Sequence, residues 1–168
     1  MLDRPGPWFA LLLVGCAAFV WLTSASLPPV VASHFGASGA ANGSMPRDLY
    51  VRFMLAIVIG APVLLVVVTY FAMGRADARI NLPNRDYWLA PERREQTISY
   101  LRGRLTRFSA VLVVFLCYVH WLVVRANQVQ PAQLSNRAMM AGLAAFVIFV
   151  LIWTRLLVRR FSNRGGGA

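Results

Sequence analysis

Long apolar runs alternate with arginine-rich breaks along the 168-residue chain. Four runs approach the roughly 20 residues that a membrane-spanning helix needs. They cover residues 8–27, 50–73, 108–124 and 138–158. No run shows the two-residue alternation of a barrel strand, and backbone groups inside hydrocarbon must be bonded internally. The pattern therefore predicts an all-α integral membrane protein, a bundle of four transmembrane helices.

The spans group into two helix pairs. Residues 1–73 are expected to form a two-helix module around an outer loop at 28–49, and the connection 74–107 leads to the second pair at 108–161. Residues 162–168 are expected to be a flexible tail. A separate soluble domain does not fit, because 58% of the residues are hydrophobic and almost every residue outside the connections is committed to lipid or to helix contacts.

The arginines predict the orientation. All 17 basic residues are arginine. Arg4, the eight arginines between residues 74 and 107, and the four beyond residue 154 make thirteen on one side of the predicted membrane. The other side carries four, which are Arg47, Arg52, Arg125 and Arg137. Because cytoplasmic loops carry the excess of positive charge, both termini and the 74–107 connection are expected in the cytoplasm, an N-in/C-in topology.

The net charge of +11 also raises the question of nucleic acid. No folded basic element that could enter a groove is visible, so we expect no nucleic-acid partner. Arginines beside helix ends are instead expected to orient the protein and to bind the anionic headgroups of membrane lipids, at about 1 kcal/mol per charge.

The first apolar run contains two apparent processing sites, a lipoprotein-like box at 13–16 and a small-residue site at 23–25. The run stays apolar through 17–22, where a lipoprotein usually turns polar, and Asp3 beside Arg4 leaves a weakly charged leader. We expect an uncleaved first helix.

Within the spans, ionisable groups are scarce. No carboxylate lies in any span, and His120 is the titratable group at depth. This disfavours a proton-coupled pump or transporter. With Trp121 and Arg125 nearby, His120 is interpreted as part of an interfacial anchor rather than as a functional histidine. Cys16 and Cys117 are expected to behave as small apolar residues, and no cofactor or metal site is expected, because no ligand spacing appears. Pro62 predicts a kink in the second span.

The outer loop 28–49 is the most specific stretch of the chain. Pro28-Pro29 ends the first helix, and Gly36, Gly39 and the Asn42-Gly43 pair supply tight turns. These features predict a Gly-rich cap that folds back onto the membrane surface.

The loop carries the pattern LPxxVxxHFxxxGxxNGxMxR and, with it, resembles the N-terminal module of SdpI-type bacterial membrane proteins. The matching residues are Leu27, Pro28, Val31, His34, Phe35, Gly39, Asn42, Gly43, Met45 and Arg47. Gly36 and Ser44 depart from the family pattern, which usually has Asn or Asp and an aromatic residue there. The resemblance covers mainly the first two helices, and longer SdpI proteins have further helices.

The resemblance implies a multi-pass protein of the bacterial cytoplasmic (inner) membrane that protects against, or senses, a secreted toxin. The outer-loop candidates for this role are His34, Phe35, Gly39, Asn42, Gly43 and Arg47. From its chemistry, His34 suits a pH-responsive contact or a loop-stabilising bond to a backbone carbonyl, and we favour the second. Metal binding is disfavoured, because Asn42 and Asp48 are its only nearby oxygen donors.

The cytoplasmic connection has its own signature at 81–92. From Pro91 onward apolar residues recur at helical spacing with arginines opposite them, which predicts an amphipathic helix over 91–107 lying on the inner leaflet. Four residues are candidates for anchoring to lipid or for docking a partner, and they are Asn81, Pro83, Tyr87 and Trp88. Lipid anchoring is favoured.

No nucleophile elbow, phosphate loop, zinc motif or facing carboxylate pair appears, so the sequence favours a non-enzyme. Three functions remain. The first is an SdpI-like immunity or sensing protein acting through the outer loop. The second is an accessory or assembly subunit bound to another membrane protein, and the third is a small transporter.

Overall fold

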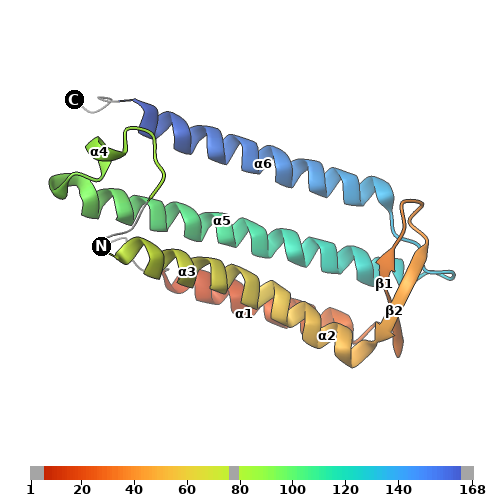
Figure 1. Cartoon of the computed structure of the whole chain (residues 1–168). Helices are drawn as coiled ribbons and strands as arrows, with labels where there is room; N and C mark the ends of the chain where they lie inside the picture. The colour runs from red at the N-terminus through yellow and green to blue at the C-terminus, as the bar shows by residue number, and fades with distance from the viewer. Residues whose placement is uncertain (1–5, 76–79, 164–168) are drawn as a thin grey trace.

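Four long helices run side by side, and a two-stranded antiparallel sheet covers one end of them (Figure 1). The computed structural model describes residues 6–75 and 80–163. The elements are α1 (Pro7–Ser24), β1 (Val30–Phe35), β2 (Ala41–Pro46), α2 (Arg47–Leu55), the π-helical turn η1 (Ala56–Gly60), α3 (Ala61–Gly74), α4 (Arg85–Trp88), α5 (Pro91–Ala126) and α6 (Asn136–Ser162). We call the end of the bundle that carries β1 and β2 the hairpin end. The opposite end, where α4 and the start of α5 lie, is called the arginine-rich end (Figure 1).

Four helices are long and apolar enough to cross a membrane, which confirms the four predicted spans in outline. Their limits differ from the predicted ones. The first helix ends at Ser24 rather than at residue 27, the second begins at Arg47 and the fourth extends to Ser162. The predicted tail at 162–168 lies almost entirely outside the described residues.

The second span is a composite of α2, η1 and α3. Pro62 is the second residue of α3, two positions after the end of the π-helical turn, and is buried. Because proline has no N–H, the carbonyl four residues earlier loses its usual partner, and a π turn is one way to absorb such a defect within a continuous helix. The predicted kink site is therefore the place where the helix changes its winding.

The third span differs most from the prediction. Residues 91–107 do not form a separate helix, because α5 continues without a break from Pro91 to Ala126. Its 36 residues span about 54 Å, well beyond a hydrocarbon core of about 30 Å. Ile98 and Leu101, which were expected to face lipid, are only 5% and 3% exposed. Burial against protein keeps this segment in line with the span.

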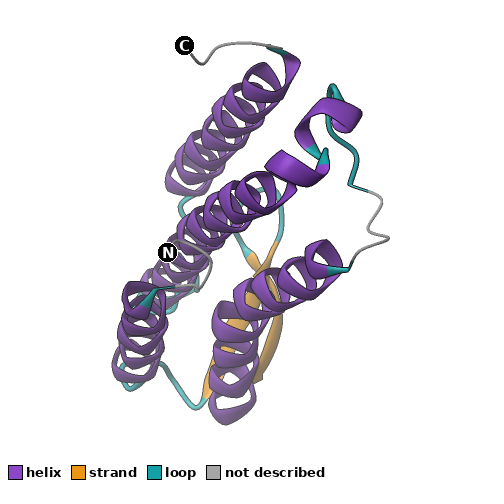
Figure 2. Ribbon diagram, turned by 90° about the vertical axis from the view of Figure 1, so that its left-hand side faces the viewer, coloured by secondary structure: helices purple, strands orange, loops and turns teal. Residues whose placement is uncertain are grey.

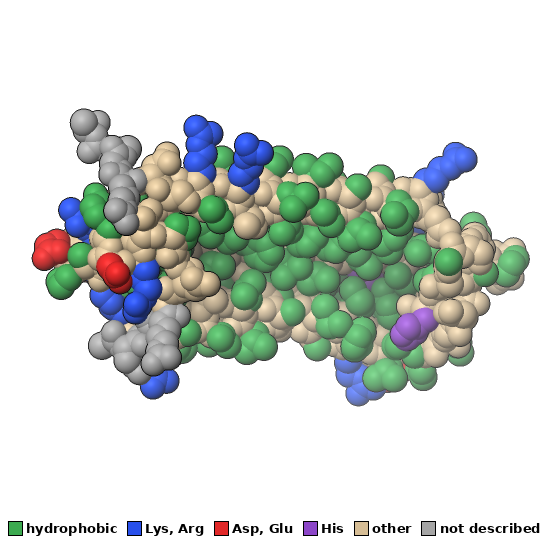
Figure 3. Space-filling model, turned by 45° about the horizontal axis from the view of Figure 1, so that its top comes forward, with side chains coloured by type: hydrophobic (Ala, Val, Ile, Leu, Met, Phe, Trp, Pro, Cys, Tyr) green, Lys and Arg blue, Asp and Glu red, His purple; other side chains and the backbone are tan. Residues whose placement is uncertain are grey.

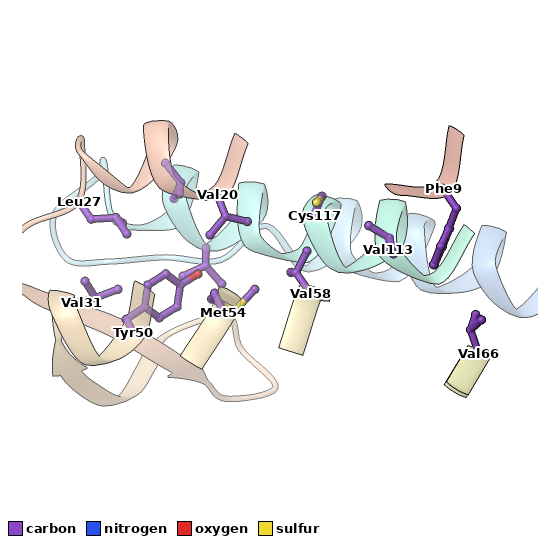
Figure 4. Close-up of a cluster of buried hydrophobic side chains, with 12 residues drawn as sticks. Phe9, Val20, Leu27, Val31, Tyr50, Met54, Val58, Val66, Val113 and Cys117 are labelled. Atoms are coloured by element: carbon purple, nitrogen blue, oxygen red, sulfur yellow. The ribbon is translucent and has the colours of Figure 1, made fainter. Parts of the chain in front are cut away.

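The core lies between α1, the composite second span and α5. Val20, Val58 and Val113 come one from each of these elements and are completely buried (Figure 4). Seen along the helices, α5 occupies the centre and α6 stands apart from α1 and α3 (Figure 2). None of the most apolar window of α6 is buried in the protein.

Apolar side chains cover the middle of the surface, and the visible acidic residues gather at the arginine-rich end (Figure 3). This is the distribution expected of a protein whose central band faces hydrocarbon.

Candidate functional site at the hairpin end

The loop 28–49, predicted as a Gly-rich cap, is an ordered β-hairpin. Pairing runs from Val30 opposite Pro46 to Phe35 opposite Ala41. At the tip, the Gly36 N–H donates to the Ala40 carbonyl over 2.9 Å. Gly39 has φ of +82°, a conformation that L side chains rarely adopt. The glycines therefore supply the turn that joins two strands.

The pairing is irregular at its centre. His34 lies opposite Gly43, whereas the pairs on either side are Ala32 with Ser44 and Phe35 with Ala41. One residue on each strand, Ser33 and Asn42, is therefore left without a partner. Bulges of this kind change the direction of neighbouring side chains and are frequent beside functional sites. The hairpin contains two such bulges, one between Ala32 and His34 and one between His34 and Phe35.

Asn127, just past the end of α5, binds β1 as a neighbouring strand would. Its Oδ1 accepts from the Ala32 N–H over 2.8 Å, and its Nδ2 donates to the Ala32 carbonyl over 2.9 Å. One amide side chain thus satisfies both backbone groups of a residue on an edge strand. The hairpin is fixed to the third span, 95 residues away in the chain.

The tip of the hairpin is fixed to the segment between α5 and α6. The Leu134 N–H donates to the Gly39 carbonyl over 2.8 Å, and the Gln133 side chain donates to the Ser38 carbonyl over 2.9 Å. Asn136 donates to the Ala37 carbonyl over 2.6 Å. A Cβ at Gly39 would overlap the Leu134 carbonyl oxygen. Only glycine fits this position, for reasons of space as well as of backbone conformation.

Two more of the predicted loop residues support the hairpin. The Arg47 N–H donates to the Pro29 carbonyl over 2.9 Å, and its Nη1 donates to the Leu27 carbonyl over 3.1 Å. Arg47 thereby satisfies carbonyl groups between the first helix and the hairpin. Phe35 is half-buried and packs against the core and against a second cluster of buried residues, Leu122, Ala126 and Leu134. Both residues therefore stabilise the hairpin against the rest of the protein.

The remaining predicted residues differ. His34 and Asn42 are exposed, and Gly43 lies across from His34 so closely that a Cβ there would be 3.1 Å from the His34 Cβ. The Nδ1 of His34 is 3.0 Å from the hydroxyl oxygen of its neighbour Ser33. That is a local contact, not the loop-stabilising bond to a backbone carbonyl favoured from the sequence. The six candidates therefore divide into a supporting set and an exposed polar pair, His34 and Asn42.

Directly beneath the hairpin lies a buried polar cluster that the sequence did not indicate. The Nε2 of His120 on α5 is 2.8 Å from the Thr23 hydroxyl on α1, and its Nδ1 is 3.0 Å from the Tyr50 hydroxyl on α2. The Tyr50 and His120 rings stack with centroids 5.8 Å apart. His120 is completely buried, so its interpretation as an interfacial anchor is wrong. The burial of His120, which its residue type does not reveal, excludes that interpretation.

The hydrogen positions in this cluster follow from the requirement that each buried polar atom has a hydrogen-bond partner. The Thr23 hydroxyl donates to the Phe19 carbonyl over 2.6 Å, which leaves its oxygen to accept from Nε2 of His120. The Nδ1 of His120 then accepts from the Tyr50 hydroxyl. Every polar atom has a partner, which makes the Thr23–His120–Tyr50 cluster a tie between three helices.

At the arginine-rich end, Trp88 is used within the protein. Its Nε1 donates to the Phe161 carbonyl over 2.9 Å, and the Asn84 side chain donates to the same carbonyl over 3.0 Å. Trp88 is therefore not free to anchor in lipid or to dock a partner through its N–H. Tyr87 is exposed beneath the Arg93 guanidinium, 4.2 Å from the ring centroid. Asn81 is exposed and Pro83 half-buried.

In the described ranges 6–75 and 80–163, no three His, Cys, Asp or Glu residues are grouped to hold a metal ion. The chain matches no family model, no curated protein and no solved structure. The function proposed below therefore depends on the geometry of the hairpin end.

Proposed function

We propose that this protein is an immunity or sensing protein of the bacterial cytoplasmic membrane, similar to SdpI-type proteins, and that it acts through the hairpin. In this proposal the hairpin faces outward and the arginine-rich end faces the cytoplasm. The excess of arginine at that end supports the orientation. The ligand is a secreted peptide or protein toxin.

The observation that carries the proposal is the contrast between a well-fixed hairpin and the exposed polar pair that it presents. Side-chain and backbone bonds from Asn127, Gln133, Leu134 and Asn136 hold the hairpin to the bundle. A surface held in this way loses little conformational entropy when a ligand binds.

The exposed pair suits a peptide ligand. An imidazole and an amide each offer both donor and acceptor groups, so His34 and Asn42 can satisfy the N–H and C=O groups of a peptide backbone. The two bulges place these residues at an irregularity in the pairing, where side-chain directions depart from simple alternation. Neither residue takes part in holding the hairpin to the helices.

The test is survival of a sensitive bacterium that carries the gene during exposure to the secreted toxins of related strains. We expect His34→Ala and Asn42→Ala to lose protection while the amount of protein in the membrane stays normal. Ser38→Ala is the matched control, because Ser38 is an exposed hairpin residue that binds Gln133 through its backbone carbonyl. Unchanged survival with both variants would remove the proposal.

A second candidate function, an accessory subunit of a larger membrane complex, is favoured by the position of α6. This helix packs mainly against α5 and leaves most of its apolar surface uncovered by protein. Purification from native membranes in mild detergent should then yield a partner at fixed stoichiometry. A lone, monodisperse protein would count against this function. Transport is the third candidate, and the absence of carboxylates from the apolar runs 8–27, 50–73, 108–124 and 138–158 disfavours it.

A further inference from the structure

The contact between α5 and α6 is closest near the hairpin end and continues further along through aromatic rings. Near the hairpin end, the Tyr118 hydroxyl donates to the Ala138 carbonyl over 2.6 Å. Gly142 lies so close to the Tyr118 ring that a Cβ there would overlap it. The Phe115 and Phe146 rings then stack with centroids 4.4 Å apart. Further along, the Phe108 ring packs against Phe149 and Trp153, with centroids 6.1 and 5.2 Å apart. These rings leave an unfilled space beside them on the surface of the two helices.

The unfilled space is an apolar groove of about 330 Å³, open on one side. We call it the seam groove. Its walls include Val111, Val114 and Phe115 from α5 and Ala145, Phe146 and Phe149 from α6. The walls are hydrocarbon and aromatic surface, which suits a flexible apolar chain. In a membrane, the molecules at hand with such chains are lipids.

A cation lies in line with the groove. Arg107, Val111, Val114 and Tyr118 follow one another at spacings of four, three and four residues, so they share one edge of α5. Arg107 is exposed and forms no hydrogen bond or ion pair with the described part of the chain. Arg104, one turn away, has its Nη2 3.4 Å from the Trp153 carbonyl and also lacks a carboxylate partner there. The end of the groove therefore carries uncompensated positive charge.

The dimensions also fit. Eleven residues separate Arg107 from Tyr118, which is about 16 Å along the helix axis. One leaflet contributes about half of a hydrocarbon core of about 30 Å. A phosphate bound at Arg107 would therefore allow an acyl chain to follow the groove to the depth where Tyr118 and Gly142 close it.

We propose that the seam groove is a binding site for one anionic phospholipid, with its phosphate bound by Arg107 and one acyl chain lying between α5 and α6. The guanidinium group matches a phosphate with two parallel N–H donors, and a basic pocket between helices at the membrane surface attracts anionic headgroups. The lipid fills the gap that the protein leaves between α6 and the rest of the bundle. This site is separate from the hairpin and does not depend on the immunity proposal.

The test is native mass spectrometry of the full chain in mild detergent, with added phosphatidylglycerol or phosphatidylcholine of the same acyl chains. We expect one phosphatidylglycerol to stay bound preferentially. Arg107→Gln should lower that preference about five-fold, because one basic residue near the membrane surface contributes about that factor to the binding of an anionic lipid. Arg137→Gln is the charge-matched control at the hairpin end of α6, and its binding should equal that of the unmodified protein.

Two further variants examine the acyl chain. Ala145→Phe and Val114→Phe each fill the groove without removing charge, and both should reduce retention of phosphatidylglycerol. Equal binding of the two lipids by the unmodified protein, or undiminished binding by Arg107→Gln, would overturn the proposal. A dimeric mass that disappears in Ala145→Phe would also overturn it, because a second copy would then occupy the groove.

Discussion

The four helices are held together in two different ways. The helices α1, α2–α3 and α5 share a hydrophobic core and, near the hairpin, the Thr23–His120–Tyr50 cluster. Helix α6 shares little of that core and packs mainly against α5, through rings along its middle as well as through contacts near its ends. At one end Phe161 packs against Trp88, and at the other Tyr118 binds the Ala138 carbonyl. The first arrangement buries side chains of three helices against one another, whereas the second depends on one neighbouring helix and leaves a groove beside the ring contacts.

The difference shows how small a set of contacts can fix a helix in a membrane. Lipid chains are as apolar as the side chains they replace, so apolar burial alone gives no strong drive for helices to associate. Close packing and hydrogen bonds must supply it. In the three-helix group close packing continues along the interface, while α6 packs on α5 through a few residues, chiefly aromatic rings and the contact of Gly142 with Tyr118. Substitutions at those residues should therefore show which contacts hold the three-helix group and which hold α6.

The largest expected effect is the loss of the buried cluster. His120→Leu leaves the Tyr50 hydroxyl without a partner in a buried place, at a cost of about 1–3 kcal/mol per unsatisfied group. Unfolding in mixed micelles of mild detergent and dodecyl sulfate would measure the loss of stability. A variant as stable as the unmodified protein would show that the cluster does not hold the three helices.

A matched pair of threonines sharpens this result. Thr23 and Thr69 are both half-buried and each donates to the carbonyl four residues earlier, but only Thr23 also contacts His120. Thr23→Ala should cost more stability than Thr69→Ala, by about 0.6 kcal/mol, as is typical of hydrogen bonds between membrane helices. Equal losses of stability in the two variants would mean that the contact between Thr23 and His120 adds nothing beyond the bond to the helix backbone.

A change of similar size is expected where α6 meets α5. Gly142→Ala places a methyl group against the Tyr118 ring and should cost about 1–3 kcal/mol through overpacking. Gly15→Ala is the control, because nothing lies within 4 Å of the added methyl group on α1. The same unfolding assay, together with cross-linking between cysteines placed on α5 and α6, would show whether α6 has moved. No difference between the two glycines would contradict the close contact.

A smaller and more local effect is expected at the hairpin. Asn127→Ala removes both hydrogen bonds to Ala32 and should cost about 1–2 kcal/mol, mainly in the local stability of the hairpin. Hydrogen exchange of the β1 amides should become faster while exchange in the core of α5 stays the same. Uniformly faster exchange would mean that the hairpin and the bundle open together.

The smallest effect is expected at the exposed ion pair between Arg52 and Asp48, whose atoms are 2.5 Å apart. Both side chains are more than two-thirds exposed, and such pairs contribute between nothing and about 1 kcal/mol. Arg52→Gln should therefore leave the unfolding midpoint almost unchanged. A large loss would indicate that α2 depends on this pair more than its exposure suggests.

Sequence reasoning succeeded where the environment acts on one segment at a time. The spans follow from the length and hydropathy of each run, because lipid requires every spanning segment to satisfy its own backbone. Pro62 marked the irregular turn for the same reason, since a missing N–H is a local defect. The hairpin was missed as a pair of strands, because β2 contains no β-branched residue and β1 contains only Val30 and Val31.

Reasoning failed where partners come from distant segments. Nothing in the spacing of Thr23, Tyr50 and His120 indicates that one histidine binds both hydroxyl groups. The amphipathic pattern of 91–107 predicted a surface helix, because a pattern identifies an apolar face without saying whether protein or lipid covers it. Trp88 was assigned to lipid for the same reason, whereas it binds the end of α6.

By itself, then, the sequence determined that this is a membrane protein with four spanning helices, because hydropathy and helix length are properties of single segments. The tertiary structure decided which polar residues are buried between helices, which support the hairpin and which remain exposed. The physical reason is that a hydrogen bond in a buried place depends on a partner's position in space. For Asn127 and Ala32 that partner is 95 residues away in the chain.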